Sequence, residues 1–299
     1  MNKLDLLRIF LRVTELSSFT QAAESLGLPK ANVSDSIRAL EDLLGTRLLH
    51  RTTRKVQATQ DGLALYERAH GLLAEMEQLE AMFAQREPQL TGKLRVDLPT
   101  LIARRTVVPQ LGSFLAAHPL LEIEVSSTDR RVDLVREGFD CVLRVGGLQD
   151  SSLIARPLGE MPLINCASPA YLSRYGVPHT LADLEHHRLV HYVQVLGARS
   201  PGFEYRENGV DCQLTMAGSV TVNNAEAYEA AALGGLGIVQ APATGARRHL
   251  DSGELVAFMP DFAAAPMPVS LLYASRRHVP ERVRVFMDWL ATVLASTLA

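Results

Sequence analysis

The sequence predicts an N-terminal, all-α winged helix-turn-helix with a long linker helix, followed by a larger α/β domain. Three observations predict this fold class. Apolar residues recur at helical spacing around the turn Gly27-Leu28-Pro29, a heptad spacing begins at Leu65, and strand-like and helix-like segments alternate from Gly92 onward. The length of 299 residues fits about two or three domains.

Composition excludes several protein classes. With 47% hydrophobic and 21% charged residues, the chain is neither disordered nor fibrous in type. No apolar run reaches the roughly 18 residues that cross a membrane, and charged residues interrupt the apolar N-terminal stretch, which argues against a signal peptide. The cysteines Cys141, Cys166 and Cys212 are far apart and lack metal-ligand spacing. We therefore expect reduced thiols, no metal, no membrane partner and a cytoplasmic location.

Three helices are expected in the first 45 residues. The first has apolar residues at positions i, i+3, i+4 and i+7 starting from Leu6. The second opens at Ser18, whose spacing to Gln21 is that of a capping box, and it ends at Gly27. The buried stripe of the third helix is expected to be Val33, Ile37, Leu40 and Leu44.

The outer face of the third helix favours a DNA-binding motif over an ordinary helical hairpin. Its side chains are short or basic, so its N-terminal half can enter a major groove. Residues 1–60 hold nine Lys or Arg against six Asp or Glu, although the net charge of the chain is −3. The stretch 47–59 suits a two-stranded wing whose basic tip meets phosphates. The expected DNA-binding residues are Ser18, Thr20, Lys30, Ala31, Asn32, Ser34, Asp35, Arg38, Arg51, Thr52, Arg54 and Lys55.

A linker helix is expected over residues 60–88, between the DNA-binding domain (1–59) and the α/β domain (92–299). Thr59 is its expected N-cap, and Pro88 ends it. The heptad stripe suits either packing on its own domain or a short coiled coil, and the length of about 40 Å favours a dimer. A dimer predicts a two-fold symmetric operator in duplex DNA. The expected dimerisation seam is Leu65, Ala69, Leu72, Met76, Leu79 and Phe83.

Four segments of this region resemble the LysR-type transcriptional regulators: 18–28 (SFTQAAESLGL), 33–41 (VSDSIRALE), 44–52 (LGTRLLHRT) and 59–62 (TQDG). The resemblance covers the whole chain in order, spacing and length. It implies a sequence-specific regulator that responds to a small-molecule effector, contacts RNA polymerase and forms a homodimer or a dimer of dimers. Pro29-Lys30-Ala31 and Asp35 depart from the usual pattern of the family, so the operator half-site need not follow its commonest sequence.

The C-terminal two-thirds alternates expected strands (94–98, 121–125 and 141–145) with expected helices (101–117, 132–138 and 280–298). Such alternation predicts a parallel-type sheet with helices on both faces. The resemblance implies two α/β lobes, as in a periplasmic binding protein, with an effector cleft between them. Lobe I is expected at about 92–161 and 267–299, and lobe II at about 162–266.

Polar residues at the carboxyl ends of these strands are candidates for the effector site, because ligands of open α/β sheets bind there. Hydroxyl residues in such places are equally often helix caps or turn residues, and their convergence favours a ligand role. Arg144 suits either a carboxylate ligand or a structural acid such as Asp129 or Asp140. The expected effector-binding residues are Thr100, Leu101, Ser126, Thr128, Arg144, Val145, Gly146, Asn223 and Asn224. An organic or aromatic acid is one candidate effector, and no cofactor is expected.

Other functions have weaker support. An enzyme is not expected, because no G-x-S-x-G, P-loop or H-E-x-x-H motif is present, and the glycines at 234–237 lack dinucleotide-binding spacing. His186, His187 and His191 lack a carboxylate or cysteine at metal-ligand spacing. A redox-responsive regulator would need a reactive Cys166, whereas a buried strand thiol is the ordinary case. A non-regulatory solute-binding protein would need export.

Overall fold

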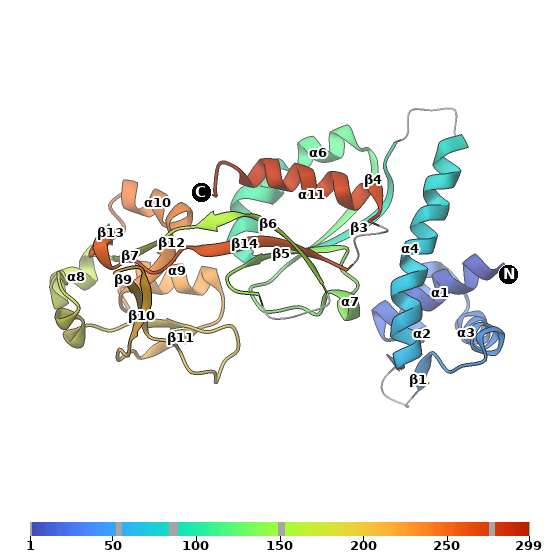
Figure 1. Ribbon diagram of the computed structural model, residues 1–299, viewed down its shortest axis with the longest axis horizontal. Coiled ribbons are helices and arrows are strands. Elements are labelled where there is room, and N and C mark those ends of the chain that lie inside the picture. Colours follow the sequence, from blue (N-terminus) through green and yellow to red (C-terminus); the bar gives the residue numbers. More distant parts are fainter. Residues whose placement is uncertain (1, 52–55, 84–88, 149–152, 275–278, 299) are drawn as a thin grey trace.

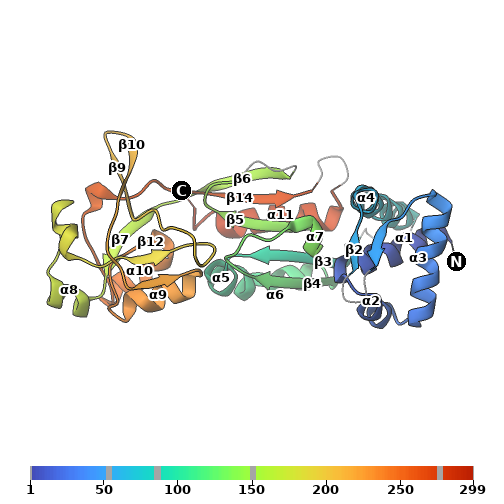
Figure 2. The same ribbon diagram turned by 90° about the horizontal axis from the view of Figure 1, so that it is seen from below.

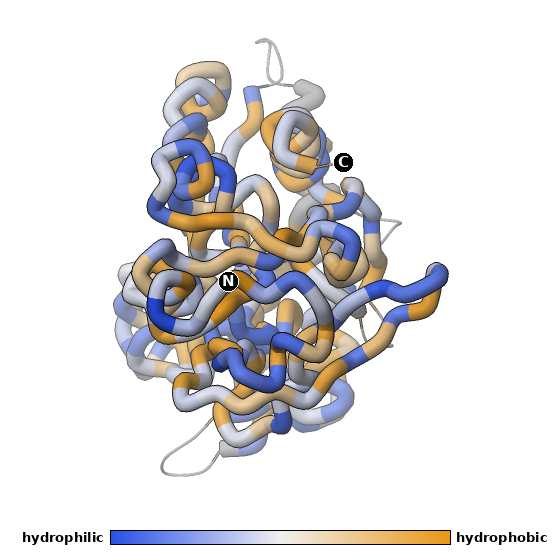
Figure 3. The backbone as a smooth tube through the Cα atoms, turned by 90° about the vertical axis from the view of Figure 1, so that its left-hand side faces the viewer, coloured by the Kyte–Doolittle hydropathy of each residue, from blue (hydrophilic) through white to orange (hydrophobic). Residues whose placement is uncertain are grey.

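The computed structural model describes residues 2–51, 56–83, 89–148, 153–274 and 279–298. Three bodies follow one another along its long axis, with the helical N-terminal domain at one end and two α/β lobes beyond it (Figure 1). Within the described residues, no helix is both long and apolar enough to span a membrane. Seen along the long axis, hydrophobic and hydrophilic residues are interspersed along the backbone (Figure 3).

The N-terminal domain is a helix-turn-helix with a two-stranded wing. Its elements are α1 (Lys3–Leu16), α2 (Phe19–Leu26), α3 (Lys30–Leu44), β1 (Leu49–Arg51), β2 (Val56–Ala58) and α4 (Gln60–Phe83). The wing strands pair antiparallel, with Leu49 opposite Ala58. Phe10, Val13, Val33 and Ile37 are fully buried at the centre of the domain, as the apolar spacing of α1 and α3 predicts.

Capping residues set the limits of these helices. The Ser18 hydroxyl accepts a hydrogen bond from the Gln21 amide, which opens α2. A reciprocal capping box is formed at α1, between Asn2 and Asp5. Gly27 ends α2 in the left-handed region at φ +64°, which an L-residue adopts only with strain. The turn of the motif is thus fixed by local sequence.

The buried stripe of α3 differs from the prediction at its end. Leu44 is 46% exposed, because the helix ends at Gly45 and Leu48 and Leu49 of the following segment fill the core in its place. Glu41 is buried there instead, and its carboxylate accepts hydrogen bonds from the amides of Leu48 and Leu49 at 2.9 and 3.2 Å. An acid therefore connects α3 to the segment that leads into the wing.

Lobe I is built on a five-stranded sheet in the order β4-β3-β5-β14-β6. The expected parallel sheet is in fact mixed: β4, β3 and β5 are parallel, whereas β14 pairs antiparallel with both β5 and β6. The reason is that β14 returns from lobe II without a crossover helix. The helices α6 and α11 lie side by side against the sheet, with Phe114 and Phe286 in edge contact (Figure 1). The elements are β3 (Thr91–Leu98), α5 (Thr100–Ile102), a π turn (Ala103–Val107), a 3-10 turn (Val108–Gln110), α6 (Leu111–Ala117), β4 (Leu120–Ser127), α7 (Leu134–Glu137), β5 (Cys141–Val145), β6 (Ile154–Met161), β14 (Met267–Tyr273) and α11 (Glu281–Leu294).

Lobe II has smaller sheets. One has the order β12-β7-β13 and is antiparallel, while β8 and β11 pair in parallel. The hairpin of β9 and β10 projects away from the body of the lobe (Figure 2). The elements are β7 (Leu163–Ala167), α8 (Pro169–Tyr175), a 3-10 turn (Ala182–His186), β8 (Val190–Tyr192), β9 (Phe203–Glu207), β10 (Val210–Leu214), β11 (Val220–Val222), α9 (Ala225–Leu233), β12 (Val239–Pro242), α10 (Ala243–Asp251), β13 (Val256–Ala257) and a 3-10 turn (Pro260–Phe262).

Candidate functional sites

The outer face of α3 is open to solvent. Lys30, Ala31 and Asn32 in its first turn are exposed, and Ser34 is half-buried. Asp35 and Arg38 form an exposed ion pair at 3.5 Å, with side chains 71% and 67% exposed. An exposed pair of this kind contributes little to stability, so Arg38 is free to exchange Asp35 for another anion. An exposed helix face with polar and basic residues in its first turn and an exposed guanidinium two turns later suits major-groove recognition.

The other expected DNA-binding residues lie at the edges of this face. Ser18 is occupied as the N-cap of α2, and Thr20 next to it is exposed. Arg51 ends β1, which places its backbone in the wing. Thr52, Arg54 and Lys55, the expected tip of the wing, lie outside the described residues.

The stripe expected to form a dimer is divided in α4. Thr59 is the N-cap, as its hydroxyl accepts a hydrogen bond from the Gly62 amide at 2.9 Å. Ala69 is 2% exposed and Leu65 packs beside it, so both belong to the core of their own domain and Ala69 is not available to a partner chain. A straight helix drifts relative to a strict heptad, which turns the later positions outward.

Leu72 and Leu79 are 48% and 51% exposed, and Met76 between them is half-buried. These three residues form the free part of the stripe. Nothing is described for the side chain of Phe83, and the expected helix end at Pro88 lies outside the described residues.

The N-terminal domain contacts lobe I directly. Gly138, at the end of α7, has φ +69°, and a Cβ atom there would lie 2.7 Å from Nη1 of Arg95 and 3.0 Å from Cγ of Glu15. Val135 of α7 packs on the core of the N-terminal domain. Burial, together with the neighbouring Glu15 carboxylate, raises the pKa of the Tyr66 hydroxyl in α4. The positive φ favours glycine at this contact between α1 and lobe I, and a side chain there would also displace the side chains of Arg95 and Glu15.

Three of the expected effector residues converge on Asp97, at the end of β3. Its carboxylate is fully buried and accepts hydrogen bonds from the hydroxyls of Ser126 (2.7 Å) and Thr128 (3.1 Å). Nη2 of Arg144 donates to its other oxygen at 3.1 Å. Burial raises the pKa of Asp97, and its hydrogen bonds to Ser126 and Arg144 oppose that rise. Arg144 therefore has an acid partner that is neither Asp129 nor Asp140.

Thr100 instead meets Asp129, which follows β4. Oδ1 of Asp129 accepts from the Thr100 amide at 2.9 Å, and Oδ2 accepts from the Thr100 hydroxyl at 2.7 Å. The same Oδ2 accepts from the amide of Ala225, the first residue of α9, at 2.6 Å. Because Thr100 belongs to lobe I and Ala225 to lobe II, one carboxylate joins the two lobes where α5 faces α9 (Figure 2).

Ion pairs extend this contact between the lobes. We call the whole contact the interlobe seam. It consists of Thr100, Arg104, Arg105 and Asp129 of lobe I and Ala225, Glu226, Glu229 and Gly245 of lobe II. Nη2 of Arg105 donates to Glu229 at 2.5 Å, and its Nη1 donates to the carbonyl of Gly245 at 3.3 Å. Arg104 pairs with Glu226 at 3.1 Å. The Arg105 pair is 20% and 17% exposed, whereas the Arg104 pair is 69% and 46% exposed. Of these two pairs, the Arg105 pair is the more shielded from water.

The remaining expected effector residues lie around the same end of the sheets. Asn224 caps α9 by accepting a hydrogen bond from the Ala227 amide at 2.8 Å, which is the helix-cap alternative for this residue. Leu101, Val145 and Asn223 are half-buried. The Gly146 amide donates to the carbonyl of Pro268 in β14.

Sequence reasoning missed Asp97, Tyr192 and the pair Arg105–Glu229. A signal existed for Asp97, which is an acid within a strand whose other residues from Leu94 to Leu98 are mostly apolar. Tyr192 ends β8, and its ring meets Tyr228 edge-on at 5.5 Å between centroids. Burial, assisted by the charge of Asp129, raises the pKa of Tyr192 to about 12. No local pattern announces Arg105, because its partner is 124 residues away.

The cysteines and histidines have structural surroundings. Burial raises the pKa of Cys166 to about 12, and burial also raises that of Cys141, so both are protonated thiols at neutral pH. His187 is buried beside the ring of Tyr171, and His191 bonds to the Ser200 hydroxyl through Nδ1. Among the described residues, no three His, Cys, Asp or Glu side chains are grouped as metal ligands.

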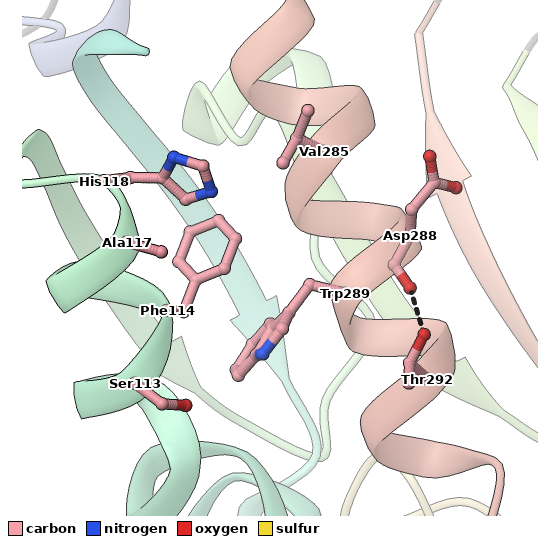
Figure 4. Close-up of a pocket in the computed structure, with 8 residues that line it drawn as sticks. All are labelled: Ser113, Phe114, Ala117, His118, Val285, Asp288, Trp289 and Thr292. Carbon is pink, nitrogen blue, oxygen red and sulfur yellow. Dashed lines mark hydrogen bonds between the residues drawn. The ribbon is translucent and has the colours of Figure 1, made fainter. Parts of the chain in front are cut away.

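A hollow of about 390 Å³ lies between α6 and α11, on the outer side of lobe I (Figure 4). Aromatic rings line it, with Phe114 and Trp289 at 4.9 Å between centroids. None of the expected effector residues contributes to its lining. It is therefore separate from the interlobe seam.

Comparison with known proteins agrees with this architecture. A family model described as a bacterial regulatory helix-turn-helix protein of the lysR family matches residues 4–63, and one described as the LysR substrate binding domain matches residues 87–295. The uncharacterized HTH-type transcriptional regulator YhjC of Escherichia coli (strain K12) is 44% identical over 299 residues, covering 100% of both chains.

Two solved structures share the arrangement of the whole chain. The Vibrio cholerae virulence activator AphB, a member of the LTTR protein family, is 30% identical, with a TM-score of 0.59 and coverage of 99% of this chain and 100% of that one. CrgA, a LysR-type transcriptional regulator from Neisseria meningitidis, is 28% identical, with a TM-score of 0.60 and coverage of 98% and 99%. This chain belongs to the LysR family of transcriptional regulators, with a helix-turn-helix DNA-binding domain and a two-lobed effector-binding domain.

Proposed function

We propose that this regulator binds a two-fold symmetric operator as a dimer, and that a change at its interlobe seam changes its affinity for the DNA. The observation that carries the proposal is the open outer face of α3, where Ser34 is half-buried and Arg38 is exposed, with an equally exposed ion pair to Asp35. The effector would be a small molecule, with an organic or aromatic acid as the candidate class. It would act at the seam, because the polar strand ends of both lobes meet there.

The contact between α1 and α7 supports a route from the seam to the DNA. Lobe I contacts the N-terminal domain at Gly138. A movement of lobe I relative to lobe II would therefore also move the N-terminal domain. Effector and DNA are then coupled, and each changes the affinity for the other by the same factor.

The dimer would form through the free part of the α4 stripe. Leu72, Met76 and Leu79 are spaced at four and three residues, which aligns them on one side of the helix. Exposed leucines at this spacing support a helix partner from a second chain. The proposal has further parts. Two dimers pair, the protein contacts RNA polymerase, and it acts in the cytoplasm. It has no enzymatic activity and needs no cofactor.

The test is DNA binding by the full-length protein. Genomic fragments that the protein retains are footprinted, and their affinity is measured between about 50 and 200 mM salt, over which phosphate contacts weaken binding steeply. We expect a protected site of two symmetric halves. The double change Leu72→Glu and Leu79→Glu should give a monomer in sedimentation and lose the symmetric footprint. A wild-type protein without salt-sensitive DNA binding would overturn the proposal.

A thermal-shift screen of organic and aromatic acids tests the effector, since a ligand that binds the folded state raises Tm with its concentration. A compound found in this way should change the DNA titration of the wild type. Compounds that bind yet leave both affinity and footprint unchanged would contradict coupling.

A further inference from the structure

Asp129 has the contacts that a bound acid would have. Its two oxygens take three donors, the amide and hydroxyl of Thr100 and the amide of Ala225. Oxygens of a small carboxylate ligand would use the same kinds of donor at the start of a helix. The donors come from both lobes, so whatever fills this position joins the lobes.

The charge of Asp129 is compensated in an unusual way. Within the described part of the chain, no lysine or arginine forms an ion pair with it, whereas Asp97 one strand away pairs with Arg144. Asp129 instead faces the N-terminus of α9, a helix of nine residues whose first amides carry partial positive charge. Its negative charge also reaches Tyr192, whose pKa it helps to raise. Asp129 is thus bound by amides and a hydroxyl, which are the groups that would bind a carboxylate ligand.

We propose that Asp129 is a built-in ligand: its carboxylate joins the lobes when no effector is bound, and an acidic effector competes with it for the donors of Thr100 and Ala225. This rests on the proposed function, in which effectors act at the interlobe seam. Two carboxylates cannot share these donors while both are ionised, because like charges at such a distance repel strongly. An acid therefore enters only as Asp129 leaves, and its entry removes one link between the lobes while the Arg105–Glu229 pair remains.

The experiment replaces the built-in carboxylate by a free one. Amide hydrogen exchange is followed at the start of α9 in the full-length wild type and in Asp129→Ala, with sodium acetate as the probe and sodium chloride at equal ionic strength as the reference. In chloride, the Ala225 amide should exchange about tenfold or more faster in Asp129→Ala, because a hydrogen bond to a charged group is lost. Acetate should restore its protection with a saturating dependence on concentration.

Three variants serve as controls. Asp133→Ala removes a carboxylate from the same loop, where it caps α7 by accepting from the Arg136 amide, and it should change neither Ala225 exchange nor the acetate response. Asp129→Asn keeps the shape but fills the space, so its faster exchange should not be reversed by acetate. Adding Thr100→Val to Asp129→Ala should weaken acetate binding, since one donor is gone. If Asp129→Ala folds only in acetate, the refolding yield in acetate against chloride is the readout.

Each outcome decides the proposal. Acetate protection confined to Asp129→Ala supports it. Equal acetate responses in wild type and Asp129→Ala would show that Asp129 does not occupy the donors, and no response in either would show that the donors hold no free carboxylate. Both results overturn the proposal. DNA plays no part in these measurements, so they can fail while the proposed regulator function stands, and the reverse also holds.

Discussion

The N-terminal domain and the interlobe seam are held together by different interactions. In the N-terminal domain, buried apolar residues such as Phe10 and Ile37 pack between helices that lie within the first 83 residues of the chain. At the seam, the bonds from Asp129 to Ala225 and from Arg105 to Glu229 join residues 96 and 124 positions apart, and all of them are polar. The apolar core holds the N-terminal domain in one arrangement, while the polar contacts of the seam can change when a ligand binds or the pH changes.

The largest effect on stability is expected from a change in the apolar core of the N-terminal domain. Phe10→Ala should destabilise the N-terminal domain by about 3–5 kcal/mol, because a fully buried ring is replaced by a cavity. The lobes should be unaffected. The chain has one tryptophan, Trp289, and it lies in lobe I, so its fluorescence reports lobe unfolding while circular dichroism also follows the helical domain. Equal shifts of both signals would show that the two regions unfold as one unit.

A smaller effect is expected at Glu41, the acid that links α3 to the wing. Glu41→Ala should destabilise the N-terminal domain by about 2–3 kcal/mol, since the buried amides of Leu48 and Leu49 lose their acceptor. Glu41→Gln keeps one acceptor oxygen and should lose less. Urea denaturation followed by circular dichroism measures both. Exposed Asp42, next in sequence, gives the control Asp42→Ala, and equal losses at 41 and 42 would contradict the role of Glu41.

At the seam, Arg105→Ala should reduce the stability of the effector domain by about 2 kcal/mol, because a largely buried, charged hydrogen bond to Glu229 is lost. The matched control is Arg104→Ala, whose exposed pair with Glu226 contributes about 0–1 kcal/mol. Trp289 fluorescence in urea measures the difference. If the two variants behave alike, burial does not distinguish the pairs.

The pH dependence of the seam gives the smallest effect. Burial raises the pKa of Glu229, but its hydrogen bond and charge interaction with Arg105, together with those of His249, outweigh burial and leave the pKa below its ordinary value. The unfolded chain then binds a proton at higher pH than the folded one, so the contribution of Glu229 is present at neutral pH and is lost as pH falls through the folded pKa. The stability difference between wild type and Arg105→Ala should therefore shrink on acidification below about pH 5. A constant difference down to pH 3 would contradict this assignment.

Sequence reasoning was most successful where structure is local. Helical spacing and the caps at Ser18, Gly27 and Thr59 predicted the helices of the N-terminal domain, because each signal lies within a few residues of its effect. It was wrong for Leu44, since burial at the end of a helix depends on what covers it. It was also wrong for Ala69, which lies inside α4 and packs in the core of its own domain.

The rule that ligands bind at the carboxyl ends of strands selected polar residues that lie close together in the structure. It did not predict which side chains form hydrogen bonds with each other. It did not identify Asp97 as the acid that Ser126, Thr128 and Arg144 share, or Asp129 as the bridge to lobe II. Those pairings depend on the order of strands in space, and β14 returning antiparallel from lobe II could not be read from local alternation.

The central claim, that the outer face of α3 reads DNA, is tested most directly by two arginines of equal charge. Arg38→Ala removes an exposed arginine from this face, and Arg206→Ala removes one from the β9–β10 hairpin of lobe II, where it pairs with Asp211. Affinity for the footprinted operator is titrated at one salt concentration. The account predicts a loss of about tenfold or more for Arg38→Ala and a change within about twofold for Arg206→Ala. Equal affinities of the two variants would contradict it.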